Sequence, residues 1–457
     1  LKAGRAGKKV LMLEKMPVVG GNSAICGGNV ACPVNPVQKA QGIKDSRELF
    51  IADCLKDGLG LNHVELLSKI VDRCNDTIKF VEDCGAEFVP NHMLFEGGHS
   101  VPRSYEIKAG TGSGYIHPMY DQIKKLSNVT VKTRAKFDDF IMDGDAVVGV
   151  TYREGYRFNA KLQSDDLENK TGKTKTVRAK LGVMLAAGGF SRDIWFRQIQ
   201  DPRVVPTTDS TNQLGATAGV LVKSLGIGAA PVQLCWLQFL PYTNPREKGF
   251  GVSVNFTNHA CMDFGIVVDR KTGKRFMDEN NTYVVKARTT ALQTLDNQAW
   301  VIVDSECPVL DKVIAKFDRL HSPYGKADTI EELCKQVNLP EKNVVKEVKA
   351  YNDALAAGKL EEMVPPCTYK KPHPVAKAPF YAVPFQGGMT ATFGGPLINT
   401  KAEIQSLDGG SIPGLYAAGN AAGGIFFFNY AGGAQLGAAT VYGRIAGREL
   451  ANRAKQN

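Results

Sequence analysis

The residues best suited to chemistry lie in one stretch near the C-terminus, where small residues surround a cluster of aromatic ones. Residues 412–437 read IPGLYAAGNAAGGIFFFNYAGGAQLG. Glycine and alanine let the backbone approach a flat ligand closely. The hydroxyl of Tyr430 and the N–H groups of Gly433 or Ala434, at the start of a helix, are donors suited to an oxygen that gains negative charge.

Two elements must position these donors. Apolar and small residues predict a short buried strand over 414–418 and a helix that runs from Gly433 to about residue 452. The start of that helix carries a partial positive charge, which would suit an anionic ring atom of a bound ligand. Tyr430 stands between the strand and the helix, where a substrate would meet the ring.

A second group of candidate residues lies near the N-terminus. Residues 9–14 predict a buried strand that ends in Glu14. In a dinucleotide-binding βαβ unit such an acid binds the ribose hydroxyls, although an ordinary surface glutamate would give the same pattern. Two Gly-Gly pairs follow, at 20–21 and 27–28, and Asn22 and Ser23 between them can donate to a phosphate or a ring.

The rest of the chain alternates helices and strands, which predicts an α/β fold. Helical spacing of apolar residues predicts helices within 45–85, and alternation predicts strands within 129–150 with a hairpin turn at 143–145. Residues 180–190 predict a strand that enters a Gly-Gly turn. From about 233 to 373 the chain has more aromatic and charged residues.

The segment GLYAAGN at 414–420, followed by a Gly-rich turn and an apolar helix, resembles the flavin-closing segment of the fumarate reductase and 3-ketosteroid dehydrogenase flavoprotein superfamily. The hairpin at 267–279 resembles the start of that superfamily's capping domain. The resemblance implies a Rossmann-like FAD-binding domain, formed by 1–232 and 374–457, with an inserted α+β capping domain at 233–373. It also leads us to expect that the first strand and the GxGxxG loop are missing from this chain.

The resemblance implies that FAD is the cofactor. We expect it to be bound without a covalent link, because residues 20–31 contain no histidine that could tether the ring. The hairpin residue Phe137 is expected at the adenine pocket or, alternatively, in the core. The implied FAD-binding residues are Glu14, Lys15, Gly20, Gly21, Asn22, Ser23, Gly27, Gly28, Phe137, Ala187, Gly188, Gly189, Gly419, Asn420, Gln435 and Leu436.

Four positions depart from the fumarate reductases, which the resemblance describes as binding a small dicarboxylate through two arginines and two histidines. The matching positions hold Cys261, Tyr430, Ala391 and Leu240. Without those ligands little offsets the desolvation of two carboxylates, so fumarate is expected to be a poor substrate. The Tyr-Ala-Gly-Gly-Ala turn at 430–434 is more similar to the ketosteroid dehydrogenases, whose tyrosine and turn N–H bind the ketone oxygen.

These features predict an FAD-dependent oxidoreductase that acts on a CH–CH bond next to a carbonyl, in an apolar, steroid-like enone or ketone. Enolate charge on the oxygen would be stabilised by Tyr430 and a backbone N–H, and Tyr242 or His259 would carry the α-proton. Two alternatives stay open. One is a reductase of another enoate that serves as terminal electron acceptor, supplied by an electron-donor partner. The other is a catalytically silent flavin-binding protein.

Composition narrows the partners and the compartment. The 457 residues carry a net charge of +10 but no basic stripe interleaved with aromatic residues, so no nucleic-acid partner is expected. No apolar run reaches the length of a membrane span. The ten cysteines form no CxxC pair, so no metal site is expected. Scattered thiols favour a cytoplasmic location, although an export signal could be lost with the missing N-terminus.

Overall fold

The computed structural model describes residues 1–243, 261–262, 264–319 and 321–454. Contacts within the chain divide it into two compact units. The first comprises Leu1–Phe196, Gln213–Leu237 and Ala391–Asn457, and the second comprises Arg197–Asn212 and Gln238–Thr390. The boundaries proposed above for a capping domain, at 233 and 373, stay a prediction.

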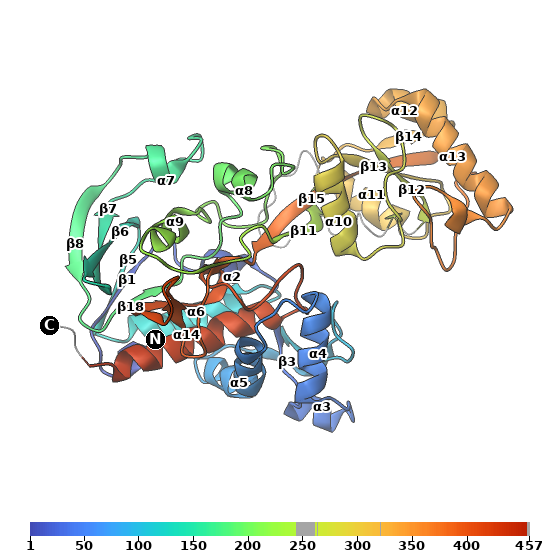
Figure 1. Ribbon diagram of the computed structural model, residues 1–457. Coiled ribbons are helices and arrows are strands. Elements are labelled where there is room, and N and C mark those ends of the chain that lie inside the picture. The colour runs from blue at the N-terminus through green and yellow to red at the C-terminus, as the bar shows by residue number, and fades with distance from the viewer. Residues whose placement is uncertain (244–260, 263, 320, 455–457) are drawn as a thin grey trace. The chain divides into compact units, whose positions relative to one another are not determined.

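The first unit is a mixed α/β structure, as the sequence predicts (Figure 1). Its helices are α1 (Lys2–Arg5), α2 (Gly21–Ile25), α3 (Pro36–Ala40), α4 (Arg47–Asp57), α5 (Val64–Glu82), α6 (Ser113–Lys124), α7 (Asp165–Glu168), α9 (Gly219–Gly226), η3 (Gly419–Ala421) and α14 (Ala434–Asn452), while α8 (Ile194–Gln200) includes residues of both units. Its strands are β1 (Val10–Leu13), β2 (Val30–Ala31), β3 (Phe88–Leu94), β4 (Ser104–Ile107), β5 (Val129–Lys132), β6 (Ala135–Asp143), β7 (Ala146–Glu154), β8 (Lys173–Arg178), β9 (Val183–Leu185), β10 (Pro231–Val232), β16 (Gly395–Pro396), β17 (Glu403–Gln405) and β18 (Ser411–Ala417).

Small sheets in this unit bring distant segments together. β1 pairs in parallel with β5, and β18 pairs in parallel with β9 and antiparallel with β17. The hairpin predicted within 129–150 is confirmed as β6 and β7, with β8 added to its edge. Because β9 and β18 run in parallel, with Leu185 opposite Ala417, the segments that follow them leave the sheet at the same edge.

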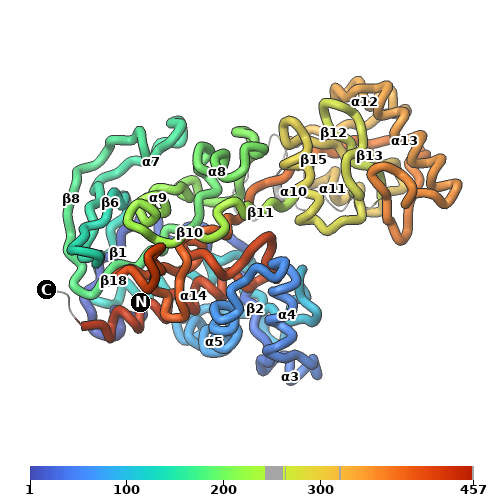
Figure 2. The backbone as a smooth tube through the Cα atoms, in the orientation of Figure 1, coloured from blue at the N-terminus to red at the C-terminus, as the bar shows by residue number. Residues whose placement is uncertain are grey.

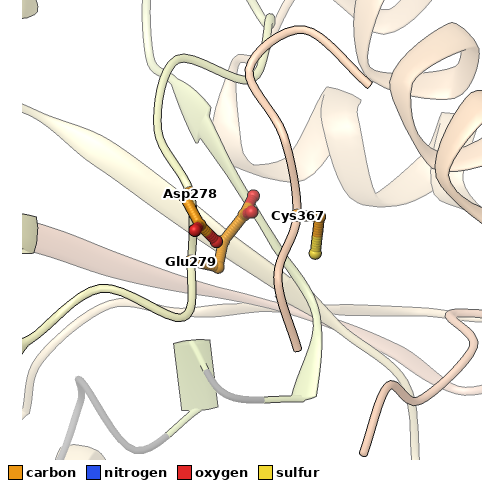
Figure 3. Close-up of side chains that lie close together, drawn as sticks. All are labelled: Asp278, Glu279 and Cys367. Carbon is orange, nitrogen blue, oxygen red and sulfur yellow. The ribbon is translucent and has the colours of Figure 1, made fainter. Parts of the chain in front are cut away.

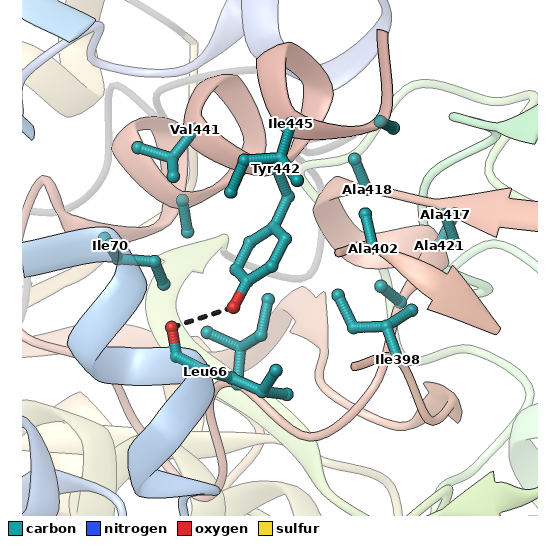
Figure 4. Close-up of a cluster of buried hydrophobic side chains, with 14 of the residues drawn as sticks. Leu66, Ile70, Ile398, Ala402, Ala417, Ala418, Ala421, Val441, Tyr442 and Ile445 are labelled. Atoms are coloured by element: carbon teal, nitrogen blue, oxygen red, sulfur yellow. Dashed lines mark hydrogen bonds between the residues drawn. The ribbon is translucent and has the colours of Figure 1, made fainter. Parts of the chain in front are cut away.

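The core of the first unit anchors the C-terminal helix. In Figure 4, α14 lies against α5, and Val441, Tyr442 and Ile445 point into the cluster between them. Their spacing places them on one helix face, and each is at most 8% exposed. The hydroxyl of Tyr442 donates to the Leu66 carbonyl at 2.9 Å. Burial of a side chain such as Val441 contributes about 1.5–3 kcal/mol, so the start of α14 is held firmly.

The first helix lies beside the last one. In Figure 2 the N-terminus lies beside α14, and α1 contacts that helix. Gly447 permits this approach, since an added Cβ there would lie 3.0 Å from the Cβ of Lys2.

The second unit contains a five-stranded sheet in the order β11–β15–β13–β12, with β14 also paired to β15. Helices α12 and α13 contact this sheet through β14 and β12. The apolar residues between them form one buried cluster that includes Ile266, Val268, Ile302, Leu333 and Val344. The elements of this unit are β12 (Ile266–Asp269), α10 (Tyr283–Gln293), β13 (Ala299–Val303), α11 (Leu310–Arg319), β14 (Gly325–Ala327), α12 (Ile330–Val337), α13 (Glu341–Ala356) and η2 (Leu360–Glu362), while β11 (Leu237–Thr243) and β15 (Phe380–Thr392) include residues of both units.

Asp278, Glu279 and Cys367 lie close together in this unit, with ligand atoms within 4.8 Å of one another (Figure 3). The two oxygens of Glu279 already accept from Arg275, at 2.9 and 2.6 Å. The Thr368 hydroxyl donates to Asp278 at 2.7 Å. Glu279 is thus paired with Arg275, and Asp278 with Thr368.

Candidate active site

Tyr430 lies on the turn that leads into α14. Its half-buried ring meets the Phe393 ring edge-on, with centroids 6.0 Å apart, and tilts against Phe426 at 5.9 Å. Phe426 and Phe427 are 5% and 0% exposed and belong to the core. Of the three phenylalanines in this segment, Phe428 is the one with a partly exposed side chain.

The backbone of this turn is strained. Phe428 has a φ of 54°, in the left-handed region, which costs a residue with a β-carbon roughly 1–2 kcal/mol. Its ring meets Trp236 edge-on at 6.0 Å. The next residue, Asn429, donates from its side chain to Asp57 at 3.2 Å. Strain of this kind persists where surrounding contacts hold it, and it is concentrated at functional sites.

Helix α14 starts directly after the turn. Gly433 is its N-cap, with a φ of 75°, and no side chain caps the helix there. The N–H of Ala434 donates to the Ala431 carbonyl at 3.0 Å, whereas the carbonyl of Gly433 accepts from Ala31 at 3.1 Å. Within the described part of the chain, the Gly433 N–H donates to no protein group. Gly433 is therefore the better placed of the two predicted backbone donors, because the N–H of Ala434 is already engaged.

Two carboxylates that the sequence reasoning missed lie at the same turn. One oxygen of Glu96 accepts from Asn29 at 3.1 Å, and the other is buried with no hydrogen-bond partner among the described residues. This second oxygen would lie 3.1 Å from a Cβ added to Gly433. Burial, and then the neighbouring Asp53, raise the pKa of Asp57 to about 6. Neither residue stands in a motif, so no local pattern could have identified them.

The predicted residues that follow β9 and β18 come together at the edge these strands share. Residues 187–189 and Asn420 line one cleft, together with 394–396 and side chains of α9. Gln435 donates to the side-chain oxygen of Asn420 at 2.6 Å, which ties the first turn of α14 to this edge. Gly419, with a φ of 65°, makes the bend between the strand and Asn420.

The acid and the lysine after β1 are both partly buried. Glu14 accepts from the Met16 N–H at 2.7 Å, and burial raises the pKa of its carboxyl. Lys15 donates to the Thr217 hydroxyl at 2.6 Å and lies 3.6 Å from Asp166. Burial lowers the pKa of Lys15, with Asp166 acting in the opposite direction. Lys15 is thus held by protein partners at the end of β1.

Two of the predicted glycines, one in the turn after Glu14 and one after β9, face open space. Gly21 and Gly188 both have positive φ, and a Cβ added to either would meet nothing within 4 Å. Gly28 is enclosed instead, since its added Cβ would lie 2.5 Å from a side chain of β4. The side-chain oxygen of Asn22 accepts from Gln213 at 2.6 Å, which leaves its NH₂ group to face a ligand. The remaining predicted cofactor residues, all partly buried, are Gly20, Ser23, Gly27, Phe137 and Leu436.

These residues fit FAD. The glycine backbones at 21 and 188 leave room for close approach by a flat or phosphorylated group, and Glu14 follows a parallel strand as a ribose-binding acid does. The cleft lined by 187–189 and Asn420 and the uncapped start of α14 belong to the same unit. These groups would hold the cofactor, while Tyr430 and Gly433 would face the substrate.

The two predicted proton carriers are not placed. His259 lies outside the described residues, and Tyr242 lies on β11 with its side chain outside them. Their role stays a prediction. Among the positions that depart from the fumarate reductases, Cys261, Leu240 and Ala391 are 0%, 5% and 2% exposed.

Comparison with known proteins agrees with this geometry. A family model described as FAD binding domain matches residues 1–436. The acrylate reductase flavoprotein subunit of Shewanella woodyi is 34% identical, over 98% of this chain and 87% of its own length. The solved open conformation of a flavocytochrome c3 fumarate reductase matches with a TM-score of 0.79 and 26% identity, over 98% of this chain and 75% of that one. The 3-ketosteroid-Δ4-(5α)-dehydrogenase of Rhodococcus jostii RHA1 matches with a TM-score of 0.74 and 22% identity, over 99% of this chain and 93% of that one, and this likeness concerns the fold alone.

Proposed function

The chain belongs to the FAD binding domain family, and from this premise we propose that it reduces the carbon–carbon double bond of a short α,β-unsaturated monocarboxylate. It is an FAD-dependent oxidoreductase that acts on CH–CH bonds. The acrylate reductase relative supports the finer statement. The apolar, steroid-like substrate favoured by the sequence pattern is less well supported, because the similarity to the steroid enzyme extends to the fold alone.

The negative charges at the Tyr430 turn favour a monocarboxylate over a dicarboxylate as the substrate. Tyr430 stands where the resemblance to fumarate reductases expects an arginine, and Glu96 and Asp57 both lie at the same turn. Each substrate carboxylate near these groups is repelled when they are ionised, by about 1 kcal/mol at 4 Å in water and about 4 kcal/mol near a protein surface. A dicarboxylate meets this repulsion with both of its charges, and a monocarboxylate with one. One carboxylate or carbonyl oxygen is therefore what the hydroxyl of Tyr430 and the N–H of Gly433 can serve.

Reduced FAD, when bound, would supply a hydride to one carbon of the double bond, and a second group would supply the proton to the other, a role for which Tyr242 and His259 stay candidates. As the double bond is reduced, negative charge builds up on the oxygen conjugated to it. The Tyr430 hydroxyl and the Gly433 N–H donate to that oxygen and stabilise the charge. The rings of Phe393 and Phe426 hold the Tyr430 ring in place, and the core contacts of α14 hold Gly433. Donors fixed in this way need little reorganisation during the reaction.

An electron-donor partner and a cytoplasmic location stay predictions. No described helix combines the length and the apolar composition that a membrane span requires.

The test uses the FAD-loaded protein, reduced anaerobically with dithionite and mixed in turn with acrylate, methacrylate, fumarate and 4-androstene-3,17-dione. We expect the absorbance of oxidised flavin to return fastest with acrylate or methacrylate. Fastest recovery with fumarate would reject the charge argument, and fastest recovery with the steroid would restore the apolar substrate. A protein that none of the four compounds reoxidises would favour the silent flavin-binding alternative.

A further inference from the structure

A buried arginine lies behind the Tyr430 turn. Arg103 is 0% exposed, and its guanidinium forms ion pairs with Asp45 at 2.8 Å and Asp53 at 2.5 Å. Its central carbon lies 4.7 Å from the centre of the Phe50 ring. Two carboxylates and an aromatic face hold the guanidinium in one orientation.

This arginine determines the tautomer of a neighbouring histidine. Arg103 lies with its Nη1 3.0 Å from Nδ1 of His99, and a guanidinium can only donate, so Nδ1 must accept. The ring proton is then on Nε2, which lies 2.6 Å from the carbonyl oxygen of Gly432 and donates to it. The Ser104 hydroxyl donates to the same carbonyl at 3.2 Å. His99 is 8% exposed.

Gly432 joins the Tyr430 turn to this cluster through both its backbone N–H and its carbonyl. Its N–H donates to the Gly97 carbonyl at 2.9 Å, and its carbonyl accepts from His99. Gly432 stands two residues after Tyr430 and immediately before Gly433 in the sequence. A shift of this peptide would move both proposed donors at once.

We propose that His99 is a positioning residue: as a neutral imidazole with its proton held on Nε2 by Arg103, it fixes the Gly432 carbonyl and with it the Tyr430 hydroxyl and the Gly433 N–H. The inference rests on the proposed function in that these two donors serve the substrate oxygen. His99 itself touches neither substrate nor cofactor, and it acts through the backbone of the turn.

Protonation of His99 would undo this arrangement, since a second N–H on Nδ1 would face the donor group of Arg103 and add a second cation beside it. The charged groups that face the ring are Arg103, Glu96 and Asp53. Burial lowers the pKa of His99 and Arg103 adds to this, while the Gly432 carbonyl, Glu96 and Asp53 act in the opposite direction. We therefore expect catalysis to fall on acidification below the ordinary histidine range.

The test compares two replacements of His99 at matched FAD content. His99→Gln keeps a donor for the Gly432 carbonyl but cannot titrate, and His99→Leu removes the donor. At about pH 7.5 we expect kcat for enoate reduction within about threefold of wild type for the glutamine variant and about 10- to 100-fold lower for the leucine variant, with little change in KM. His92→Gln is the control, because it makes the same histidine-to-glutamine replacement at a half-exposed residue that is paired with Glu106 and not with Gly432.

The pH profile separates positioning from general stability. Wild type should lose activity as the pH falls below the ordinary histidine pKa of about 6.5, and His99→Gln should lose that acid limb. Asp57→Asn should retain it, which assigns the limb to His99 rather than to the nearby carboxyl. An unchanged acid limb in His99→Gln would overturn the proposal even if His99→Leu failed to fold, and so would a wild-type kcat in His99→Leu.

A measurement without substrate keeps this proposal distinct from the proposed function. Hydrogen exchange of the peptide that covers residues 427–436 should be faster in His99→Leu than in wild type and unchanged in His99→Gln. Equal exchange in all three proteins would overturn the positioning role whatever the substrate. Faster exchange in His99→Leu, in a protein that reduces no enoate, would support the role and reject the enoate.

Discussion

The side chain of Asn429 donates to Asp57 at 3.2 Å, across 372 positions of the sequence, and this bond joins the Tyr430 turn to the end of α4. The acceptor is an unusual carboxyl. Burial, with Asp53 second, raises the pKa of Asp57 from 3.8 to about 6. The folded protein therefore binds this proton more tightly than the unfolded chain does.

Asp57→Asn should stabilise the protein at neutral pH. The stability that the raised pKa contributes is fully present below 3.8 and is lost as the pH rises through about 6, because the ionised carboxyl is disfavoured in the folded state. The neutral amide avoids this loss, so at about pH 7.5 we expect a gain of about 1 kcal/mol, allowing for partial exposure, and almost none at about pH 4. Urea unfolding at both pH values measures it, with the exposed Asp143→Asn as control. A lower stability at pH 7.5 would contradict the assignment.

Tyr430→Phe should lose catalysis without losing the cofactor. Removal of a donor that strengthens in the transition state typically lowers kcat by ~100- to 1000-fold, with KM little changed. Tyr442→Phe is the matched control, since its hydroxyl donates to the Leu66 carbonyl in the core. That variant should lose about 1 kcal/mol of unfolding free energy and keep its turnover number. Equal turnover numbers for Tyr430→Phe and wild type would remove Tyr430 from the mechanism.

Gly98→Ala should disturb the same turn from the opposite side. Gly98 has a φ of 87°, and an added Cβ would lie 2.0 Å from an Asp57 oxygen and 2.9 Å from the Ala431 backbone. Gly110→Ala is the control, because Gly110 has a φ of 67° with nothing within 4 Å of its added Cβ. Both variants carry a backbone cost of about 1–2 kcal/mol, but only Gly98→Ala should lower kcat as well. Steady-state rates and thermal unfolding decide the point; equal effects of the two variants would contradict the steric argument.

FAD should leave the protein when it unfolds. Residues 20–31 contain no histidine for a covalent link, and the cleft at 187–189 offers backbone and Asn420 rather than a tether. After acid denaturation and centrifugation we expect the yellow colour in the supernatant. Colour retained in the precipitated protein would show a covalent bond.

Local patterns of the sequence were enough to predict much of the flavin-side framework. The strand before Glu14, the hairpin within 129–150 and the helix after Gly433 follow from apolar periodicity and glycine positions, which act over a few residues. The meeting of 187–189 with Asn420 needed the structure, because the parallel pairing of β9 with β18 joins strands that lie far apart in the chain. The same local pattern singled out Tyr430, but it could not choose between a steroid and a short enoate.

The sequence by itself determined the α/β framework, and it predicted the FAD-binding turns and the candidate donor Tyr430. Only the tertiary structure decided what surrounds that donor. The bonds of Gly432 to His99 and of Asn429 to Asp57 span 333 and 372 positions, and no pattern of a few residues encodes such pairs. The same holds for the N–H of Gly433, which has no acceptor among the described residues, and for the engaged N–H of Ala434. The path of the strained turn, and not residue type, sets where each N–H points.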